Sequence, residues 1–134
     1  MKMNGKTFAE VMERFRFISV QESFDCVVAI ANGGIIPAAI INQRLGLPLY
    51  LLTINWRDDN KKPRYDSPRL MMPIDFDYKN KKILLVDDRV KSGSTILFAK
   101  EKLAGALMIK TFAVNGHADY ALYDENCFRF PWLI

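Results

Sequence analysis

The chain has 134 residues, of which 50% are hydrophobic and 25% are charged, and its formal net charge at pH 7 is +4. This length and balance are typical of one folded domain with its own core, and they exclude an intrinsically disordered chain. The two cysteines, Cys26 and Cys127, have neither the number nor the spacing of a disulfide framework or a zinc site.

The amino-terminal residues lack the continuous apolar segment of a signal peptide, and no stretch approaches the roughly 18 apolar residues of a membrane span. We therefore expect a cytoplasmic protein with no membrane partner. The Lys and Arg residues are scattered along the sequence, which argues against nucleic acid as a partner. The basic balance still suits a site for phosphate groups.

Apolar residues recur at helical spacing in some segments and form short runs with β-branched residues in others. Thr7 and Glu10 have the spacing of a capping box, so the first helix should begin at about Phe8. In chain order we predict a helix over 8–21, a strand over 26–31, a helix over 35–45, strands over 49–54 and 83–86, a helix over 94–103 and a strand over 107–114. Strands that alternate with helices predict an α/β fold, with one parallel sheet covered by helices on both faces, in a single domain over 1–134.

Three unusual segments stand at the carboxyl ends of predicted strands: 32–34 (Asn-Gly-Gly), the polar stretch 57–72, and 87–95 (DDRVKSGST). Ligands of a parallel α/β sheet bind in the crevice outside these ends, so we expect the three segments to share one site. The stretch 57–72 is long and polar for so small a domain, which is typical of a functional loop or a disordered segment, and an irregular hairpin is also open.

The run 92–95 (Ser-Gly-Ser-Thr) leads directly into a predicted helix. Free N–H groups at a helix N-terminus and the neighbouring hydroxyls can bind an anion, although an ordinary helix cap is the alternative. Asp87 and Asp88 end the preceding strand, and their mutual repulsion must be offset by a ligand. Vicinal ribose hydroxyls or a Mg²⁺ ion would do this. An acid pair a few residues from a phosphate pocket has the spacing of a sugar phosphate.

The segment 83–95 (ILLVDDRVKSGST) resembles the phosphoribosyl-pyrophosphate (PRPP) signature of type I phosphoribosyltransferases. The segment 27–50 (VVAIANGGIIPAAIINQRLGLPLY) resembles the strand, pyrophosphate loop and helix of the same family. The terminal Phe-Pro-Trp over 130–132 resembles the tail of the short xanthine/guanine (purine) enzymes. The resemblance covers about residues 24–132, in the order that the family has.

This resemblance implies an enzyme of nucleotide salvage, a phosphoribosyltransferase that moves ribose 5-phosphate from PRPP to a nucleobase-like acceptor and releases pyrophosphate, with Mg²⁺ as cofactor. The candidate catalytic residues are Asp87, Asp88 and Lys91, and the two acids would also be the metal ligands. The other implied contacts are the 5′-phosphate at Ser92, Gly93, Ser94 and Thr95, the pyrophosphate at Asn32, Gly33 and Gly34, and the base at Val114, Cys127 and Phe128. The stretch 57–72 would be the family's mobile lid. The family is often dimeric, and the apolar stripe of the first helix would suit a homodimer.

Four positions depart from the pattern of the purine enzymes. Lys91 stands where they usually carry Asp, Asn32 where they commonly carry Arg, Val114 where a Lys reads the base, and Cys127 where an aromatic ring stacks on it. These departures motivate a second hypothesis, a non-catalytic relative that binds PRPP or a nucleotide as a regulator. A receiver-like phosphoacceptor domain is a third hypothesis, against which stands the lack of a further Asp and Lys at the expected strand ends.

Overall fold

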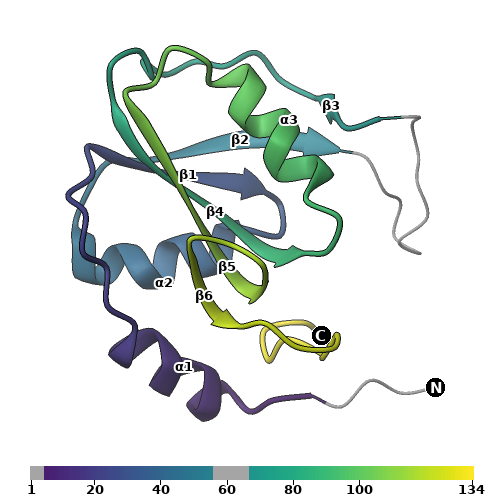
Figure 1. Ribbon diagram of the computed structural model, residues 1–134. Helices are drawn as coiled ribbons and strands as arrows, with labels where there is room; N and C mark the ends of the chain where they lie inside the picture. The colour runs from purple at the N-terminus through teal and green to yellow at the C-terminus, as the bar shows by residue number, and fades with distance from the viewer. Residues whose placement is uncertain (1–4, 56–66) are drawn as a thin grey trace.

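The computed structural model describes residues 5–55 and 67–134, which form a six-stranded sheet in the order β3-β2-β1-β4-β5-β6 (Figure 1). The strands are β1 (Cys26–Ala31), β2 (Leu49–Asn55), β3 (Arg69–Leu70), β4 (Lys82–Val90), β5 (Met108–Gly116) and β6 (Tyr120–Tyr123), and the helices are α1 (Phe8–Phe17), α2 (Ile35–Leu45) and α3 (Ser94–Lys102). Neighbouring strands are parallel, except that β3 runs antiparallel to β2. The predicted α/β fold is confirmed.

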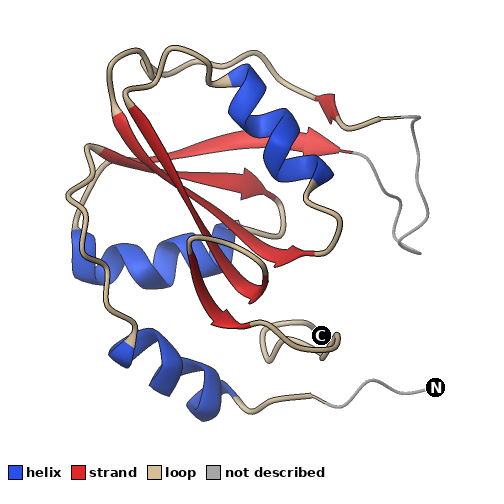
Figure 2. Cartoon of the chain, in the orientation of Figure 1, coloured by secondary structure: helices blue, strands red, loops and turns tan. Residues whose placement is uncertain are grey.

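The sheet lies between two helical layers, with α1 and α2 on one face and α3 on the other (Figures 1 and 2). β1 is buried along its whole length, as its uninterrupted apolar sequence requires. Alternate residues of the central strands enter two separate cores. Val27 and Leu84 belong to the core beneath α1 and α2, whereas Val28 and Leu85 belong to the core beneath α3.

The first helix has the expected start but ends earlier than the sequence suggests. The hydroxyl of Thr7 accepts a hydrogen bond from the Glu10 N–H at 3.1 Å, which confirms the capping box. The helix ends at Phe17 rather than near residue 21. The guanidinium of Arg44, from α2, donates to the Ile18 carbonyl at 2.6 Å and the Arg16 carbonyl at 2.9 Å. A side chain far along the chain therefore satisfies the carbonyls that a longer helix would have bonded internally.

Strand β4 continues through the acid pair to Val90, whereas the strand predicted from the sequence ended at residue 86. Its pairing with β5 extends to Arg89↔Asn115 and Val90↔Gly116, so only residues 91–93 separate it from α3. Gly116 has φ of 142°, and a Cβ there would lie 2.3 Å from the Val90 carbonyl oxygen. The two strands can stay paired this far because glycine permits the close approach.

Strand β6 was not expected from the sequence, whereas β3 lies in the stretch 57–72, for which an irregular hairpin was one alternative. β3 occupies part of the predicted lid and bonds to β2, with the Met71 N–H donating to the Thr53 carbonyl at 2.8 Å. The remainder of that lid, up to residue 66, lies outside the described residues. β6 follows β5 after a short turn in which the Asp119 carboxylate accepts from the Thr111 N–H at 2.8 Å.

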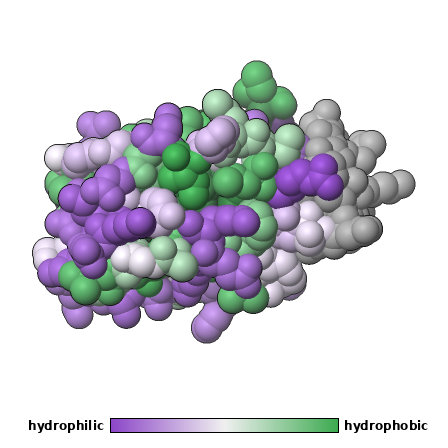
Figure 3. All heavy atoms as spheres, turned by 90° about the horizontal axis from the view of Figure 1, so that it is seen from above, coloured by the Kyte–Doolittle hydropathy of each residue, from purple (hydrophilic) through white to green (hydrophobic). Residues whose placement is uncertain are grey.

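The described ranges contain no helix long and apolar enough to cross a membrane. The view from above, over the α3 layer, shows hydrophilic and apolar side chains interspersed rather than separated (Figure 3). Leu97, on α3, is 62% exposed among them. The part of this face that is described has the mixed surface of a globular α/β domain.

Candidate active site

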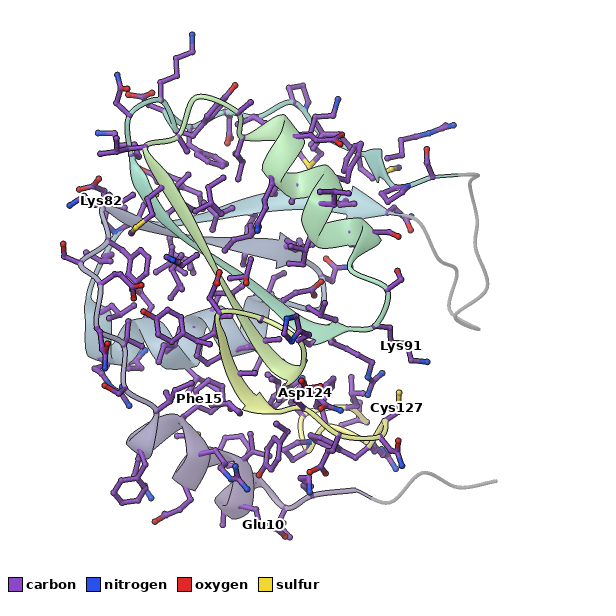
Figure 4. All side chains as sticks on the ribbon, in the orientation of Figure 1. Glu10, Phe15, Lys82, Lys91, Asp124 and Cys127 are labelled. Carbon is purple, nitrogen blue, oxygen red and sulfur yellow. The ribbon has the colours of Figure 1, made fainter. Side chains whose placement is uncertain are left out.

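A cavity of about 280 Å³ lies at the carboxyl end of β4, where the chain turns into α3. It is lined by Asp87, Asp88, Arg89, Val90, Lys91, Ser92, Gly93, Ser94, Thr95 and Ile96. The structure thus brings together the acid pair, the lysine and the turn that the sequence singled out. Figure 4 shows Lys91 at this end of the sheet, beyond the last residue of β4.

The two carboxylates of the acid pair are in unequal environments. Asp87 is only 8% exposed, whereas Asp88 is half-buried. The Asp88 N–H donates to the Asp87 carboxylate at 2.8 Å, and the Arg89 N–H donates to the Asp88 carboxylate at 2.6 Å. Burial, followed by the negative charge of Asp88, raises the pKa of Asp87 well above its ordinary range. Loss of the proton from Asp87 is therefore unfavourable. A bound cation or hydrogen-bond donors from a ligand would stabilise the charged form.

The turn before α3 presents backbone and hydroxyl donors to the cavity. Gly93 is the N-cap residue with φ of 83°, and it has no side chain with which to cap the helix. The hydroxyl of Ser92 accepts from the Ser94 N–H at 3.3 Å and bonds to the Ser94 hydroxyl at 3.0 Å. The N-cap residue itself therefore makes no side-chain cap, although the Ser92 hydroxyl already accepts one N–H of the first turn. An anion is the partner that such a start favours.

The glycine pair after β1 lies directly against the acid pair. A Cβ at Gly33 would lie 2.7 Å from the carboxylate oxygens of Asp88, and one at Gly34 would lie 2.3 Å from the Val86 carbonyl oxygen. The Gly34 N–H donates to the Ile30 carbonyl at 2.7 Å, and the peptide bond between Ala31 and Asn32 is cis. Two strand ends thus meet without intervening side chains, which leaves the Asp88 carboxylate facing the turn at 32–34.

The residues predicted to contact a base lie apart from the lining of the cavity. Val114 is fully buried in the core, and Phe128 is 4% exposed. Cys127 is partly exposed with a free thiol, and Figure 4 places it on the segment 124–132, at the same end of the sheet as Lys91. We call residues 124–132 the carboxyl-terminal segment.

Two residues that sequence reasoning did not assign hold the carboxyl-terminal segment in place. Asn115 is 2% exposed; its amide nitrogen donates to the Glu125 carbonyl at 3.2 Å, and its oxygen accepts from the Glu125 N–H at 3.0 Å. Arg89 donates from Nη2 to the Phe128 carbonyl at 2.6 Å. This guanidinium nitrogen of Arg89 therefore bonds to the protein's own backbone. Asn115 lies one residue beyond the strand predicted over 107–114, so its buried place in β5 had no signal in the sequence.

Comparison with known proteins identifies the family. The family model of the phosphoribosyl transferase domain matches residues 3–128. The chain belongs to the phosphoribosyl transferase domain family. The xanthine-guanine phosphoribosyltransferase of Chromohalobacter salexigens is 31% identical over 119 residues, which are 84% of this chain and 71% of that protein. The enzyme of the same name from Idiomarina loihiensis is 25% identical over 117 residues, covering 83% and 72% of the two chains.

A solved structure shows the same fold over nearly the whole length. The purine phosphoribosyltransferase from Pyrococcus horikoshii has a TM-score of 0.79 and 27% identity, and the match covers 98% of this chain and 94% of that one. The expected type I phosphoribosyltransferase family, fold and enzyme class are confirmed. The phosphoribosyltransferase signature stands at the cavity, since its acids and its turn are the residues that line it.

Proposed function

We propose that this phosphoribosyltransferase binds PRPP in the cavity at the end of β4 and transfers its ribose 5-phosphate to a nucleobase-like acceptor, with release of pyrophosphate. The observation that carries the proposal is the continuous lining of that cavity by the acid pair and the turn at 92–95. The lining offers carboxylates from the acid pair and amide and hydroxyl donors from the turn, which are the groups that a ribose phosphate requires.

The phosphate and the ribose have separate partners in this proposal. The 5′-phosphate accepts hydrogen bonds from the turn at 92–95, where Gly93 opens α3. The carboxylates of Asp87 and Asp88 accept hydrogen bonds from the ribose hydroxyls, in addition to the backbone N–H donors that they already have. Lys91 lines the same cavity. Its ammonium group is positively charged, so it suits a phosphate partner rather than the role of a base.

The acid pair also fits a Mg²⁺ ion, because two adjacent carboxyl groups are oxygen donors of the kind that this ion prefers, and a bound cation would offset the burial and repulsion that raise the pKa of Asp87. Asp87 and Asp88 would hold it, and the bound ion would supply positive charge to the leaving pyrophosphate. The described residues contain no cluster of three or more His, Cys, Asp or Glu side chains.

The pyrophosphate end is proposed to meet the turn at 32–34. The Gly34 N–H already donates to Ile30, so the amides of Asn32 and Gly33 are the ones that we assign to the leaving group. Negative charge develops on pyrophosphate as the anomeric bond breaks, and fixed amide donors stabilise that charge without reorganising. The ribose becomes cationic at the same time, next to the carboxylate of Asp88.

The test is pyrophosphate release from PRPP and Mg²⁺ with a panel of bases that begins with xanthine, guanine and hypoxanthine and continues with the pyrimidines. Release with one base and none without a base is the expected result. PRPP binding without turnover on any base would instead favour the regulatory alternative, which is motivated by Lys91 in the signature. A similar protein supports keeping that alternative: the bifunctional protein PyrR of Caldicellulosiruptor saccharolyticus is 38% identical over 89 residues, or 58% of this chain and 47% of that protein. Failure to bind PRPP at all would refute the proposal.

The homodimer remains a prediction. Phe8 and Phe17, at the two ends of α1, are 53% and 77% exposed. Light scattering after size-exclusion chromatography would give the mass directly, and the 15.4 kDa of one chain is the value that would contradict a dimer.

A further inference from the structure

Arg89 connects the acid pair to the carboxyl-terminal segment through both its backbone and its side chain. Its N–H donates to the Asp88 carboxylate at 2.6 Å, and its guanidinium donates to the Phe128 carbonyl at 2.6 Å. The guanidinium also lies over the ring of Phe130, with 4.6 Å between the guanidinium carbon and the ring centroid. One residue therefore contacts the proposed ligand-binding carboxylate and a segment about 40 positions later in the chain.

The contacts continue from Arg89 to the end of the chain. The Phe130 ring stacks on Trp132, with centroids 5.2 Å apart and planes 13° apart, and it meets Phe128 edge-on at 5.3 Å. Phe128 and Phe130 are 4% and 1% exposed. Because these rings are packed as one group, a displacement of the guanidinium reaches the indole of Trp132 through direct contacts.

Arg89 is a costly residue for a merely structural position. Its Nε is buried and has no hydrogen-bond partner among residues 5–55 and 67–134. An unsatisfied buried donor destabilises the folded state, which an apolar side chain in the same place would avoid. The buried Nε of Arg89 therefore lowers the stability of the fold, while the residue links Asp88 to the Phe128 backbone.

We propose that Arg89 is a positioning residue, through which occupation of the acid pair by Mg²⁺ and PRPP sets the place of the carboxyl-terminal segment. When the Asp88 carboxylate turns to its ligand, its hydrogen bond with the Arg89 N–H lengthens or breaks, and Arg89 shifts. Because the guanidinium contacts the Phe128 carbonyl and the Phe130 ring, this shift displaces Phe128 and the stacked rings. The segment contains two residues that the sequence assigns to the acceptor, Cys127 and Phe128, so PRPP would prepare the acceptor site. The inference rests on the proposed function for the identity of the ligand.

Trp132 provides the readout, since the chain has two tryptophans and Trp56→Phe leaves Trp132 alone. In this background we would titrate Mg²⁺ and PRPP while following Trp132 emission, and measure PRPP affinity by calorimetry. The variants are Arg89→Met and the conservative Arg89→Lys. Arg14→Met is the matched control, because Arg14 makes the same two contacts on the α1 side: it donates to the Leu122 carbonyl at 3.1 Å and lies 4.5 Å over the Tyr123 ring.

We expect PRPP to change Trp132 emission in the parent and in Arg14→Met. In Arg89→Met the change should be lost at saturating PRPP, while the PRPP dissociation constant rises less than about threefold. The KM for the acceptor base should rise about tenfold or more in Arg89→Met, which corresponds to about 1.4 kcal/mol and matches one charged hydrogen bond. Arg89→Lys keeps a donor and should recover part of both signals, and it replaces Arg89→Met if that variant does not fold.

Two outcomes would overturn the inference while the proposed function stands: Arg89→Met responding like Arg14→Met, or a parent protein that binds PRPP in the calorimeter with no change in Trp132 emission. A parent that binds no PRPP in the calorimeter would refute the proposed function itself, and the inference with it.

Discussion

Replacement of Gly33 by alanine should move the Asp88 carboxylate out of its place. The added Cβ would lie 2.7 Å from the carboxylate carbon and both oxygens, whereas non-bonded carbon atoms rest about 3.5–4.0 Å apart. The Asp side chain is short, so relief requires a displacement of the carboxylate by about 1 Å. A misplacement of about 1 Å in a reacting site can cost about 100-fold in rate.

We therefore expect Gly33→Ala to lower kcat/KM for PRPP by about 100-fold, or about 2.7 kcal/mol in transition-state stabilisation. Initial rates of pyrophosphate release would give kcat/KM, and calorimetry with Mg²⁺ and PRPP would give the affinity. Stability should change little, because the steric conflict is with one half-buried side chain that can rotate, and Gly33 does not need a positive φ.

Gly46→Ala is the matched control. Gly46 has φ of 62° at the C-cap of α2, and an added Cβ there would meet no atom within 4 Å. Alanine in this left-handed conformation costs about 1–2 kcal/mol of stability, so the thermal midpoint should fall while kcat/KM stays the same. An unchanged kcat/KM in Gly33→Ala would refute the reasoning, since Asp88 would then have no ligand to hold.

Three further predictions concern charge and hydrogen bonding. Asp88→Asn should weaken binding of Mg²⁺ and PRPP in calorimetry, while the thermal midpoint stays the same or rises because repulsion within the acid pair is removed; a large loss of stability at unaltered PRPP affinity would make the acid structural. Arg44→Met should lower the free energy of unfolding by about 1–3 kcal/mol in urea titrations, because the carbonyls at the end of α1 lose their donor, and an unchanged midpoint would contradict this. For Asp119, burial acts upward, but hydrogen bonds from the Thr111 N–H and hydroxyl outweigh it and lower its pKa. The ionised carboxylate therefore stabilises the fold above its unfolded pKa of about 3.9, and this contribution is lost as the pH falls through the lower folded pKa. In Asp119→Asn the free energy of unfolding should accordingly fall less steeply as the pH is lowered in this range.

The sequence alone predicted most of the elements and the segments that line the cavity at the end of β4. Apolar runs and helical spacing identified the central strands and three helices, because those patterns record which faces are buried. The rule that ligands bind at the carboxyl ends of parallel strands then brought the segments 32–34 and 87–95 to one place, and the Gly33–Asp88 approach agrees with it. The signature from 83 to 95 was informative because its residues are close in sequence and form a local structure.

Only the tertiary structure decided which long-range partners those residues have. The sequence contained Arg89 and Asn115, but nothing in their neighbourhood indicates that both bond to the backbone of the carboxyl-terminal segment. In the same way, the early end of α1 depends on Arg44 from another helix, and the length of β4 depends on Gly116 in its neighbour. These features are set by strand register and packing between distant segments. A local pattern records how each segment is buried, but the partner that satisfies a given polar group is chosen only when the whole chain has folded.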